Sequence, residues 1–216
     1  MSTLSKKILH QMKKSDPTTV WTPIDFLKLG ARDSIDKTLQ RLQKTGDIRR
    51  ISRGLYDLPR INSLTKKPVT PDYRSITEAI GRRDQVRLLV DGMTAANDLG
   101  LTSAVPGKVL IHTDGRFRPI QIGNLSIRFK LTSPSKLYWA NRPAMRIVQA
   151  LYWLRDQIDP QEPLFQDSIK SKLIALLTHP KTGPTLCSDL KAGFHTLPIW
   201  MQEFITELFQ EMDDES

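Results

Sequence analysis

Residues 31–58, ARDSIDKTLQRLQKTGDIRRISRGLYDL, decide the predicted fold of the N-terminal part of the chain. Apolar residues recur at helical spacing over 31–45, which predicts an amphipathic helix whose buried stripe is Ile35, Leu39 and Leu42. Segments 47–52 and 55–58 are predicted to be two short strands, joined by a turn at Arg53 and Gly54. The stretch therefore predicts a helix followed by a β-hairpin with a basic tip.

Two more helices are predicted before this stretch. Leu4, Ile8 and Met12 form one apolar stripe of a helix that ends near Ser15, and a second helix runs from about Pro23 to Leu29 after the N-cap residue Thr22. The order helix, helix, helix, hairpin is the layout of a winged helix-turn-helix, a DNA-binding module in which the third helix enters the major groove. We assign this domain to residues 1–60.

The face of the third helix opposite its apolar stripe carries hydrogen-bond donors and positive charge. Arg and Lys read guanine edges in the major groove, and a basic hairpin contacts the DNA backbone. We therefore predict DNA contacts from the helix residues Ser34, Lys37, Thr38, Arg41 and Lys44, and from the hairpin residues Arg49, Arg50 and Arg53. Strand alternation leaves the direction of Arg49 open, and the sequence does not separate base readers from phosphate anchors. A merely solvated basic face is the alternative interpretation.

The charge distribution also indicates a polyanionic partner. The net charge is +9 and the isoelectric point is about 9.7. Residues 1–60 carry 13 Lys and Arg against 6 Asp and Glu, residues 61–142 again carry 13 against 6, and residues 143–216 carry 6 against 11. A basic first two-thirds and an acidic last third favour one surface for nucleic acid and a rear that avoids it.

The remainder of the chain is predicted to be a second domain of mixed structure. Residues 59–72 hold three prolines and little periodicity, so we place a linker at 61–72 and a second domain at 73–216. In this domain, strands over 108–112, 118–122 and 125–131 should form an antiparallel meander. Helical periodicity predicts six helices, at about 73–83, 94–99, 143–154, 164–178, 185–192 and from 198 onward. The predicted fold class is α+β, with a small antiparallel sheet and C-terminal helices.

No pattern in the sequence indicates catalysis. The four histidines are scattered without metal-ligand spacing, and no nucleophile motif occurs. The single cysteine, Cys187, excludes a disulfide within one chain and is expected to be a small buried hydrophobe. Neither a signal peptide nor a membrane span is evident. We expect a soluble cytoplasmic protein that is not an enzyme and has no metal, cofactor or membrane partner.

Four stretches together resemble a known family. They are VWTPIDFLKLG (20–30), LQRLQKTGDIRRISRGLYDLPR (39–60), DGMTAANDLGLTSAVPGKVLIHTDG (91–115) and LPIWMQEF (197–204). Their order and spacing resemble those of the AbiEi-type antitoxins of type IV toxin–antitoxin systems and their DUF6088 relatives.

This resemblance implies a function that periodicity alone does not give. Such antitoxins bind inverted repeats in their own promoter through an N-terminal winged helix, and so repress their operon. Their C-terminal domain neutralises a cognate nucleotidyltransferase-like toxin, although direct contact with the toxin is not implied. The DNA-facing surface extends into the second domain, which makes Arg74, Arg82, Arg83 and Lys108 supplementary phosphate contacts.

The leading hypothesis is thus a DNA-binding autorepressor that is also the antitoxin of a two-gene system. The alternative is a protein-interaction module that binds a partner enzyme without sequence-specific DNA binding. An RNA-binding module is less favoured, because the paired aromatic strand motifs of single-strand binders are missing from the sequence.

Overall fold

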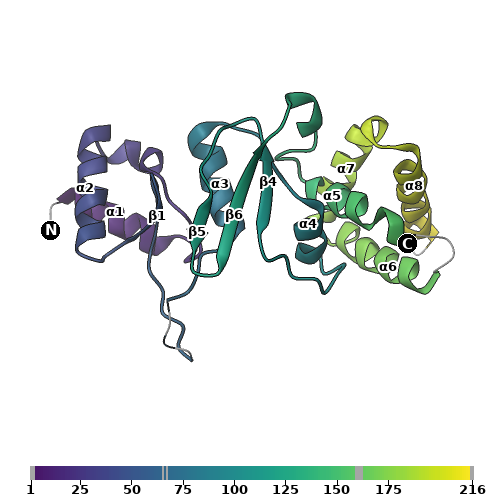
Figure 1. Ribbon diagram of the computed structural model, residues 1–216, viewed down its shortest axis with the longest axis horizontal. Helices are drawn as coiled ribbons and strands as arrows, with labels where there is room; N and C mark the ends of the chain where they lie inside the picture. The colour runs from purple at the N-terminus through teal and green to yellow at the C-terminus, as the bar shows by residue number, and fades with distance from the viewer. Residues whose placement is uncertain (1–2, 65, 67, 159–162, 215–216) are drawn as a thin grey trace. The chain divides into compact units, whose positions relative to one another are not determined.

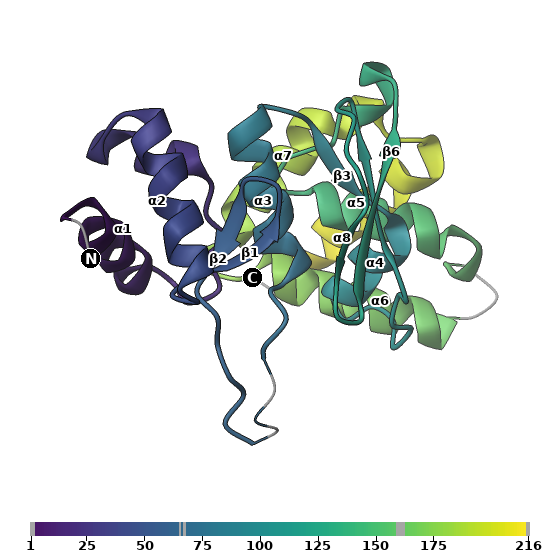
Figure 2. The ribbon, with the colours of Figure 1, turned by 60° about the vertical axis from the view of Figure 1, so that its left-hand side comes forward.

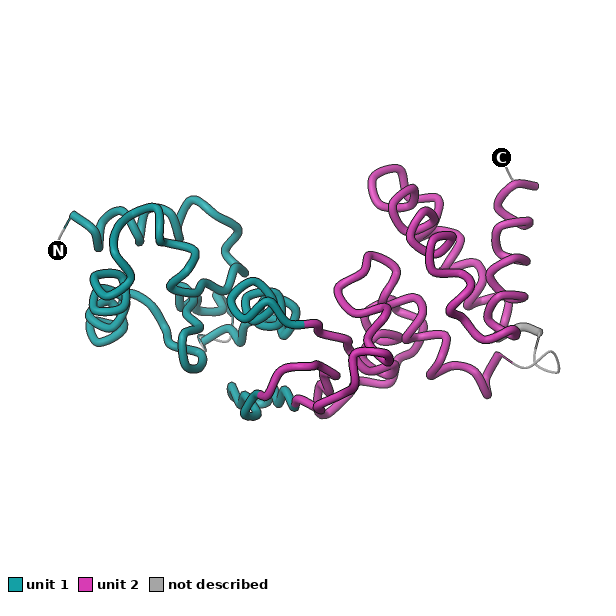
Figure 3. Tube along the Cα trace, turned by 90° about the horizontal axis from the view of Figure 1, so that it is seen from above, with its two compact units in different colours: residues 1–86, 117–128 teal, residues 87–116, 129–216 magenta. Residues whose placement is uncertain are grey.

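The chain is a mixed α+β protein with two small β-sheets and several helices, as predicted (Figure 1). The computed structural model describes residues 3–64, 66, 68–158 and 163–214. The chain forms two compact units, one made of residues 1–86 and 117–128 and the other of residues 87–116 and 129–216 (Figure 3). The main division at residue 86 differs from the predicted linker at 61–72, because the helix that starts at Tyr73 packs with the first unit.

The first unit begins with the predicted order of elements. These are α1 (Thr3–Lys14), η1 (Pro23–Leu29), α2 (Arg32–Lys44), β1 (Arg49–Ser52) and β2 (Leu55–Asp57). The second of them is a 3-10 helix rather than an α-helix. Its start is fixed by a capping box, in which the Asp25 carboxylate accepts hydrogen bonds from the Thr22 backbone N–H (2.7 Å) and hydroxyl (2.9 Å).

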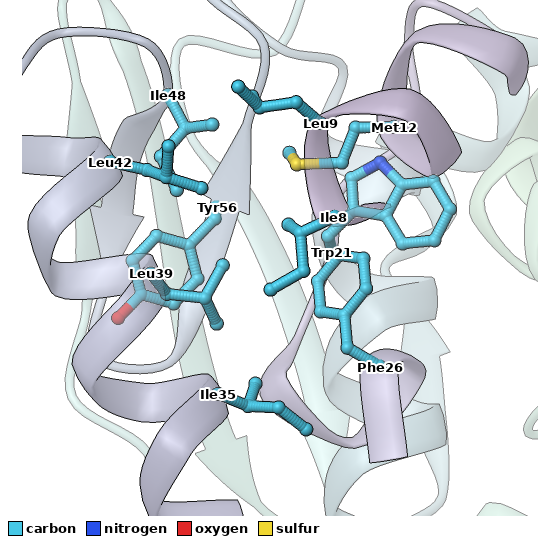
Figure 4. Close-up of a cluster of buried hydrophobic side chains, with 10 residues drawn as sticks. All are labelled: Ile8, Leu9, Met12, Trp21, Phe26, Ile35, Leu39, Leu42, Ile48 and Tyr56. Carbon is cyan, nitrogen blue, oxygen red and sulfur yellow. The ribbon is translucent and has the colours of Figure 1, made fainter. Parts of the chain in front are cut away.

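A single hydrophobic cluster holds these elements together (Figure 4). It joins the stripe of α2 to residues from α1, η1 and the hairpin, and its members are Ile8, Leu9, Met12, Trp21, Phe26, Ile35, Leu39, Leu42, Ile48 and Tyr56. The rings of Trp21 and Phe26 stack with centroids 5.2 Å apart. Trp21 also exchanges two backbone hydrogen bonds with Tyr56 of β2 (2.7 and 2.8 Å). Trp21 and Tyr56 are buried, as is Leu55 of the same strand as Tyr56.

Two further parts complete the first unit. Helix α3 (Tyr73–Asp84) follows a segment that we call the arm, residues 59–71, and starts at the N-cap residue Asp72. A second hairpin is formed by β5 (Ile120–Ile122) and the first part of β6 (Leu125–Leu131). Its two-residue turn contains Gly123, whose φ of +56° is one that L-residues rarely adopt.

The predicted meander is wrong in its strand order. β3 (Leu88–Val90) pairs antiparallel with β4 (Val109–Thr113), and the sheet order is β3–β4–β6–β5. Strand β6 therefore lies between β4 and β5, which are consecutive in the sequence. The chain between β4 and β5 ends in Pro119, which lacks the N–H that a tight hairpin ladder needs, whereas the Gly123 turn allows β5 and β6 to pair directly.

The second unit is mostly helical. Its helices are α4 (Gly92–Asp98), η2 (Pro134–Leu137), α5 (Met145–Leu154), η3 (Arg155–Gln157), α6 (Pro163–Leu177), α7 (Gly183–Gly193), η4 (Phe194–Thr196) and α8 (Ile199–Asp214). Helices α4 and α5 pack closely, and the Arg146 guanidinium on α5 pairs with the Asp98 carboxylate at 2.9 Å. Lys170 of α6 bridges two carboxylates on α8, Glu207 (3.0 Å) and Glu211 (2.7 Å).

The close approach of α4 and α5 requires a glycine at position 92. A Cβ atom there would lie 2.6 Å from the Gln149 carbonyl oxygen and 2.6 Å from the Trp153 Cβ. We predict that Gly92→Ala lowers the free energy of unfolding by about 1–3 kcal/mol, because overpacking outweighs the helix-propensity gain of at most about 1 kcal/mol. Urea denaturation measures the effect. Gly107→Ala is the control, since a Cβ there meets nothing within 4 Å, and equal stability of both variants would contradict the prediction.

Candidate nucleic-acid interface

Helix α2 presents a basic face to solvent. Lys37, Arg41 and Lys44 are exposed, as is Ser34, while the opposite side of the helix is buried in the core. Among the described residues, no carboxylate forms an ion pair with any of the three basic side chains. The Arg41 guanidinium lies along the helix, with its Nε donating to the Lys37 carbonyl oxygen at 3.3 Å. These three cations are thus available to an external anion.

The first turn of α2 carries negative charge that the predicted site did not include. Arg32 pairs with Asp36 at 2.9 Å, whereas Asp33 is exposed one turn before Lys37. A carboxylate at a helix N-terminus is favoured by the helix dipole, and it repels phosphate. In a major groove it accepts a hydrogen bond from the amino group of cytosine. The start of α2 therefore suits base edges, and the rest of its exposed face suits phosphates and guanine.

Thr38 is a wrong prediction as a groove residue. Its side chain is fully buried, and its hydroxyl donates to the Ser34 carbonyl oxygen at 2.7 Å. The position lies beside Leu42 and Ile35 on the helical wheel, so its methyl group faces the core while the backbone satisfies its hydroxyl. The candidate groove face is therefore Ser34, Lys37, Arg41 and Lys44.

Arg49 has a structural role instead of the predicted contact with the DNA backbone. Its Nε donates to Asp57 Oδ1 at 2.9 Å, and its Nη2 donates to Asp57 Oδ2 at 2.5 Å and to the Val69 carbonyl oxygen at 3.0 Å. The hydrogen bonds that the Asp57 carboxylate accepts from Arg49 raise the pKa of the Arg49 guanidinium above its usual value. Arg49 thus ties β1 to β2 and to the end of the arm.

The next residue on the strand, Arg50, is exposed, as is Arg53 at the hairpin turn. Arg50 donates from Nε to the Ser52 carbonyl oxygen at 3.4 Å, and the register of β1 and β2 shifts between these two residues. Both side chains stay in the candidate interface.

The different roles of Arg49 and Arg50 predict different effects on stability. Arg49→Ala leaves the buried carboxylate of Asp57 without its partner, which we expect to lower the free energy of unfolding by about 2 kcal/mol. Arg50→Ala removes the same side chain from an exposed position and should change it by less than about 0.5 kcal/mol. Urea denaturation of both variants tests this, and two equal effects would contradict the assigned role of Arg49.

The supplementary residues on α3 are also engaged within the first unit. The Arg82 Nη2 donates to the Val20 carbonyl oxygen at 2.9 Å, and its Nε lies 3.5 Å from Asp25. The Arg83 Nη1 donates to the Arg53 carbonyl oxygen at 2.7 Å, and the same guanidinium pairs with Asp84. These two arginines attach α3 to the segment before η1 and to the hairpin turn, so the structure assigns them a tethering role.

The other two supplementary residues, Arg74 and Lys108, are not part of this tether. Arg74 is half-buried at the start of α3, with its guanidinium 5.9 Å from the centre of the Tyr73 ring. Lys108 is exposed and belongs to the second unit. Of the four residues implied by the resemblance, three therefore lie on α3 and one lies just before β4.

The histidines and the cysteine lie apart from this interface. The described residues contain no group of three or more His, Cys, Asp or Glu that could hold a metal ion. Burial lowers the pKa of His112, whose Nδ1 lies 3.1 Å from the Thr132 hydroxyl, and burial raises the pKa of the half-buried Cys187 thiol. Within the described residues, no helix is both long enough and apolar enough to cross a membrane.

A different kind of surface lies on the second unit. Helix α8 borders two open grooves, one toward η4 and one toward α7, and both are lined by Phe194 and Thr206. The first groove also has Ile199, which is 74% exposed, and the second has Phe209. Glu203 and Glu207 border the first groove, whereas the second is bordered by one acid and one base, Asp213 and Lys191. The acidic border of the first groove suits a basic, partly apolar protein segment.

Comparisons with known proteins identify a family and a distantly similar solved structure. Residues 7–181 match the model of DUF6088, described as a family of unknown function. No curated protein matches the chain. A crystal structure of the RV2827C protein from Mycobacterium tuberculosis is similar at 17% sequence identity and a TM-score of 0.41, over 71% of this chain and 55% of that one. This chain thus spans about half the length of that protein.

Proposed function

The chain belongs to the DUF6088 family, whose function is unknown, and we propose that it is a sequence-specific binder of double-stranded DNA that represses its own promoter. The observation that carries the proposal is the exposed face of α2, where Lys37, Arg41 and Lys44 have no carboxylate partner among the described residues. The order α1, η1, α2, β1, β2 supports a winged helix-turn-helix as the module that presents this face.

In this mechanism the basic surface first attracts DNA without regard to sequence. Release of counterions from the phosphates supplies that affinity, which therefore falls steeply with salt. Helix α2 then enters the major groove, where Arg41 has the bidentate donor geometry that guanine O6 and N7 require. Asp33 at the start of the helix selects cytosine by accepting from its amino group. Arg50 and Arg53 of the hairpin contact the flanking backbone.

The biological role in the proposal comes from the resemblance to AbiEi-type antitoxins. The DNA target is then a pair of inverted repeats in the promoter of the chain's own operon. Binding there represses transcription by occupying the promoter, and the second unit neutralises a nucleotidyltransferase-like toxin.

The test is the replacement of Lys37 and of Arg41 by alanine in the full-length protein. A side chain that reads a base should cost about 1–3 kcal/mol of binding free energy and relax selectivity at one position. A phosphate contact should weaken all duplexes alike and lower the salt slope by about 1. Affinity is measured on the DNA upstream of the gene by fluorescence anisotropy.

The matched control is Lys13→Ala, which removes the same charge from an exposed position on α1. It should bind the upstream DNA nearly as the unmodified protein does, apart from a small general electrostatic loss. Unchanged affinity in both the Lys37 and the Arg41 variants would contradict the proposal that α2 binds in the major groove.

The grooves beside α8 favour a second candidate function, that of a protein-interaction module. Residues 182–216 carry one Lys or Arg against seven Asp and Glu, so this segment attracts basic proteins and repels DNA. A protein with only this function would bind the upstream DNA and a scrambled duplex equally. The two functions are compatible, because the surfaces that support them lie on different units.

A further inference from the structure

The arm, residues 59–71, is a narrow projection of the first unit. It connects β2 to α3, and Figures 1 and 2 both show its two legs, residues 59–64 and 68–71, extending away from the rest of that unit. Its two legs are joined by the backbone hydrogen bond from Val69 N to the Arg60 carbonyl oxygen (2.8 Å) and by a bridge between Ile61 and Pro68. Near the tip, Lys66 N donates to the Asn62 carbonyl oxygen at 2.9 Å.

The base of the arm is fixed to the hairpin. Arg49 donates to the Val69 carbonyl oxygen at 3.0 Å with the same guanidinium that holds Asp57. The hairpin in turn contributes Tyr56 to the core that positions α2. The arm is therefore anchored to the elements that orient the basic face of α2.

The arm exposes large apolar side chains next to basic residues. Leu64 is 90% exposed and Ile61 is 60% exposed. No Asp or Glu occurs over residues 59–71, which carry Arg60, Lys66 and Lys67. Minor-groove binders use this combination of side chains: the apolar side chain inserts between base steps, and the cations contact the phosphates that border the groove.

The turn between β1 and β2 is held within the first unit, so it does not compete with the arm for the minor groove. Its carbonyl at Arg53 accepts from Arg83, and the Arg83 guanidinium lies 3.1 Å from where a Cβ on Gly54 would be. The turn is thus held against α3 and is only two residues long. The arm, which follows β2 and leads to α3, is a longer connection than this two-residue turn.

We propose that the arm enters the minor groove next to the major groove occupied by α2, with Leu64 inserted as a wedge at a base step and Arg60 and Lys66 on the phosphates. This inference rests on the proposed DNA binding and adds a second contact to it. Architectural proteins use apolar residues in this way to bend the duplex. The target should then hold a flexible pyrimidine–purine step at the wedge position, because such steps unstack most easily.

The experiment uses the full-length protein, Leu64→Ser, and the upstream duplex labelled with fluorophores at its two ends. We expect Leu64→Ser to bind about tenfold more weakly, from the lost burial of one leucine, and to bend the duplex less by energy transfer. Leu64→Met should retain the wild-type affinity and the wild-type bending, because methionine is also a large apolar side chain. Leu27→Ser is the matched control, because Leu27 is an exposed leucine of the same unit (49%) outside the arm. Lys66→Ala should reduce the salt slope by about 0.9.

Each outcome decides the proposal. Wild-type affinity and bending in Leu64→Ser, together with lost binding in the α2 variants, would overturn the role of the arm and leave the proposed function intact. If Leu64→Ser instead lowers self-association in sedimentation without DNA, the arm is a contact between copies of the chain and the proposal is wrong. If the unmodified protein binds no duplex, both proposals fail. Urea denaturation should show equal stability for Leu64→Ser and the wild type, because the side chain is exposed.

Discussion

Burial of one stripe of α2 determines which of its residues meet solvent. Ile35 and Leu39 are fully buried against side chains of α1, η1 and the hairpin, so the helix has a single rotational position in the first unit. Rotation by half a turn would place Lys37 and Lys44 in the core, where an unpaired charge costs several kcal/mol. The basic face is thus a direct consequence of the apolar packing, and the proposed recognition of DNA depends on it.

Arginines of similar appearance in the sequence have different roles in the structure. Arg49, Arg82 and Arg83 direct their donors to carbonyl and carboxylate oxygens of the first unit, where they connect its elements. Arg50 and Arg53 remain exposed, as do the basic residues of α2. Total charge therefore overstates the surface available to DNA. The second unit has the opposite character, since its last helices are acidic and lie beyond residue 181, where the family match ends.

The sequence predicts those features of the fold that depend on residues close together in the chain. Helical periodicity located the helices and the core residues, because burial of a stripe depends on neighbours within a few turns. Local patterns do not show contacts with distant partners: Arg82 and Arg83, which the resemblance implies as phosphate contacts, donate to carbonyl oxygens 62 and 30 residues away. The strand order failed for the same reason. Thr38 was misplaced because a small polar side chain at the edge of a stripe can satisfy its hydroxyl on the backbone.

The most direct test of DNA recognition is the binding of the full-length protein to the DNA upstream of its own gene, compared with a scrambled duplex of equal length across a salt series. The account predicts discrimination of about a thousandfold or more, which persists as the general electrostatic affinity falls. Equal binding to the two duplexes, lost together as salt rises, would contradict it.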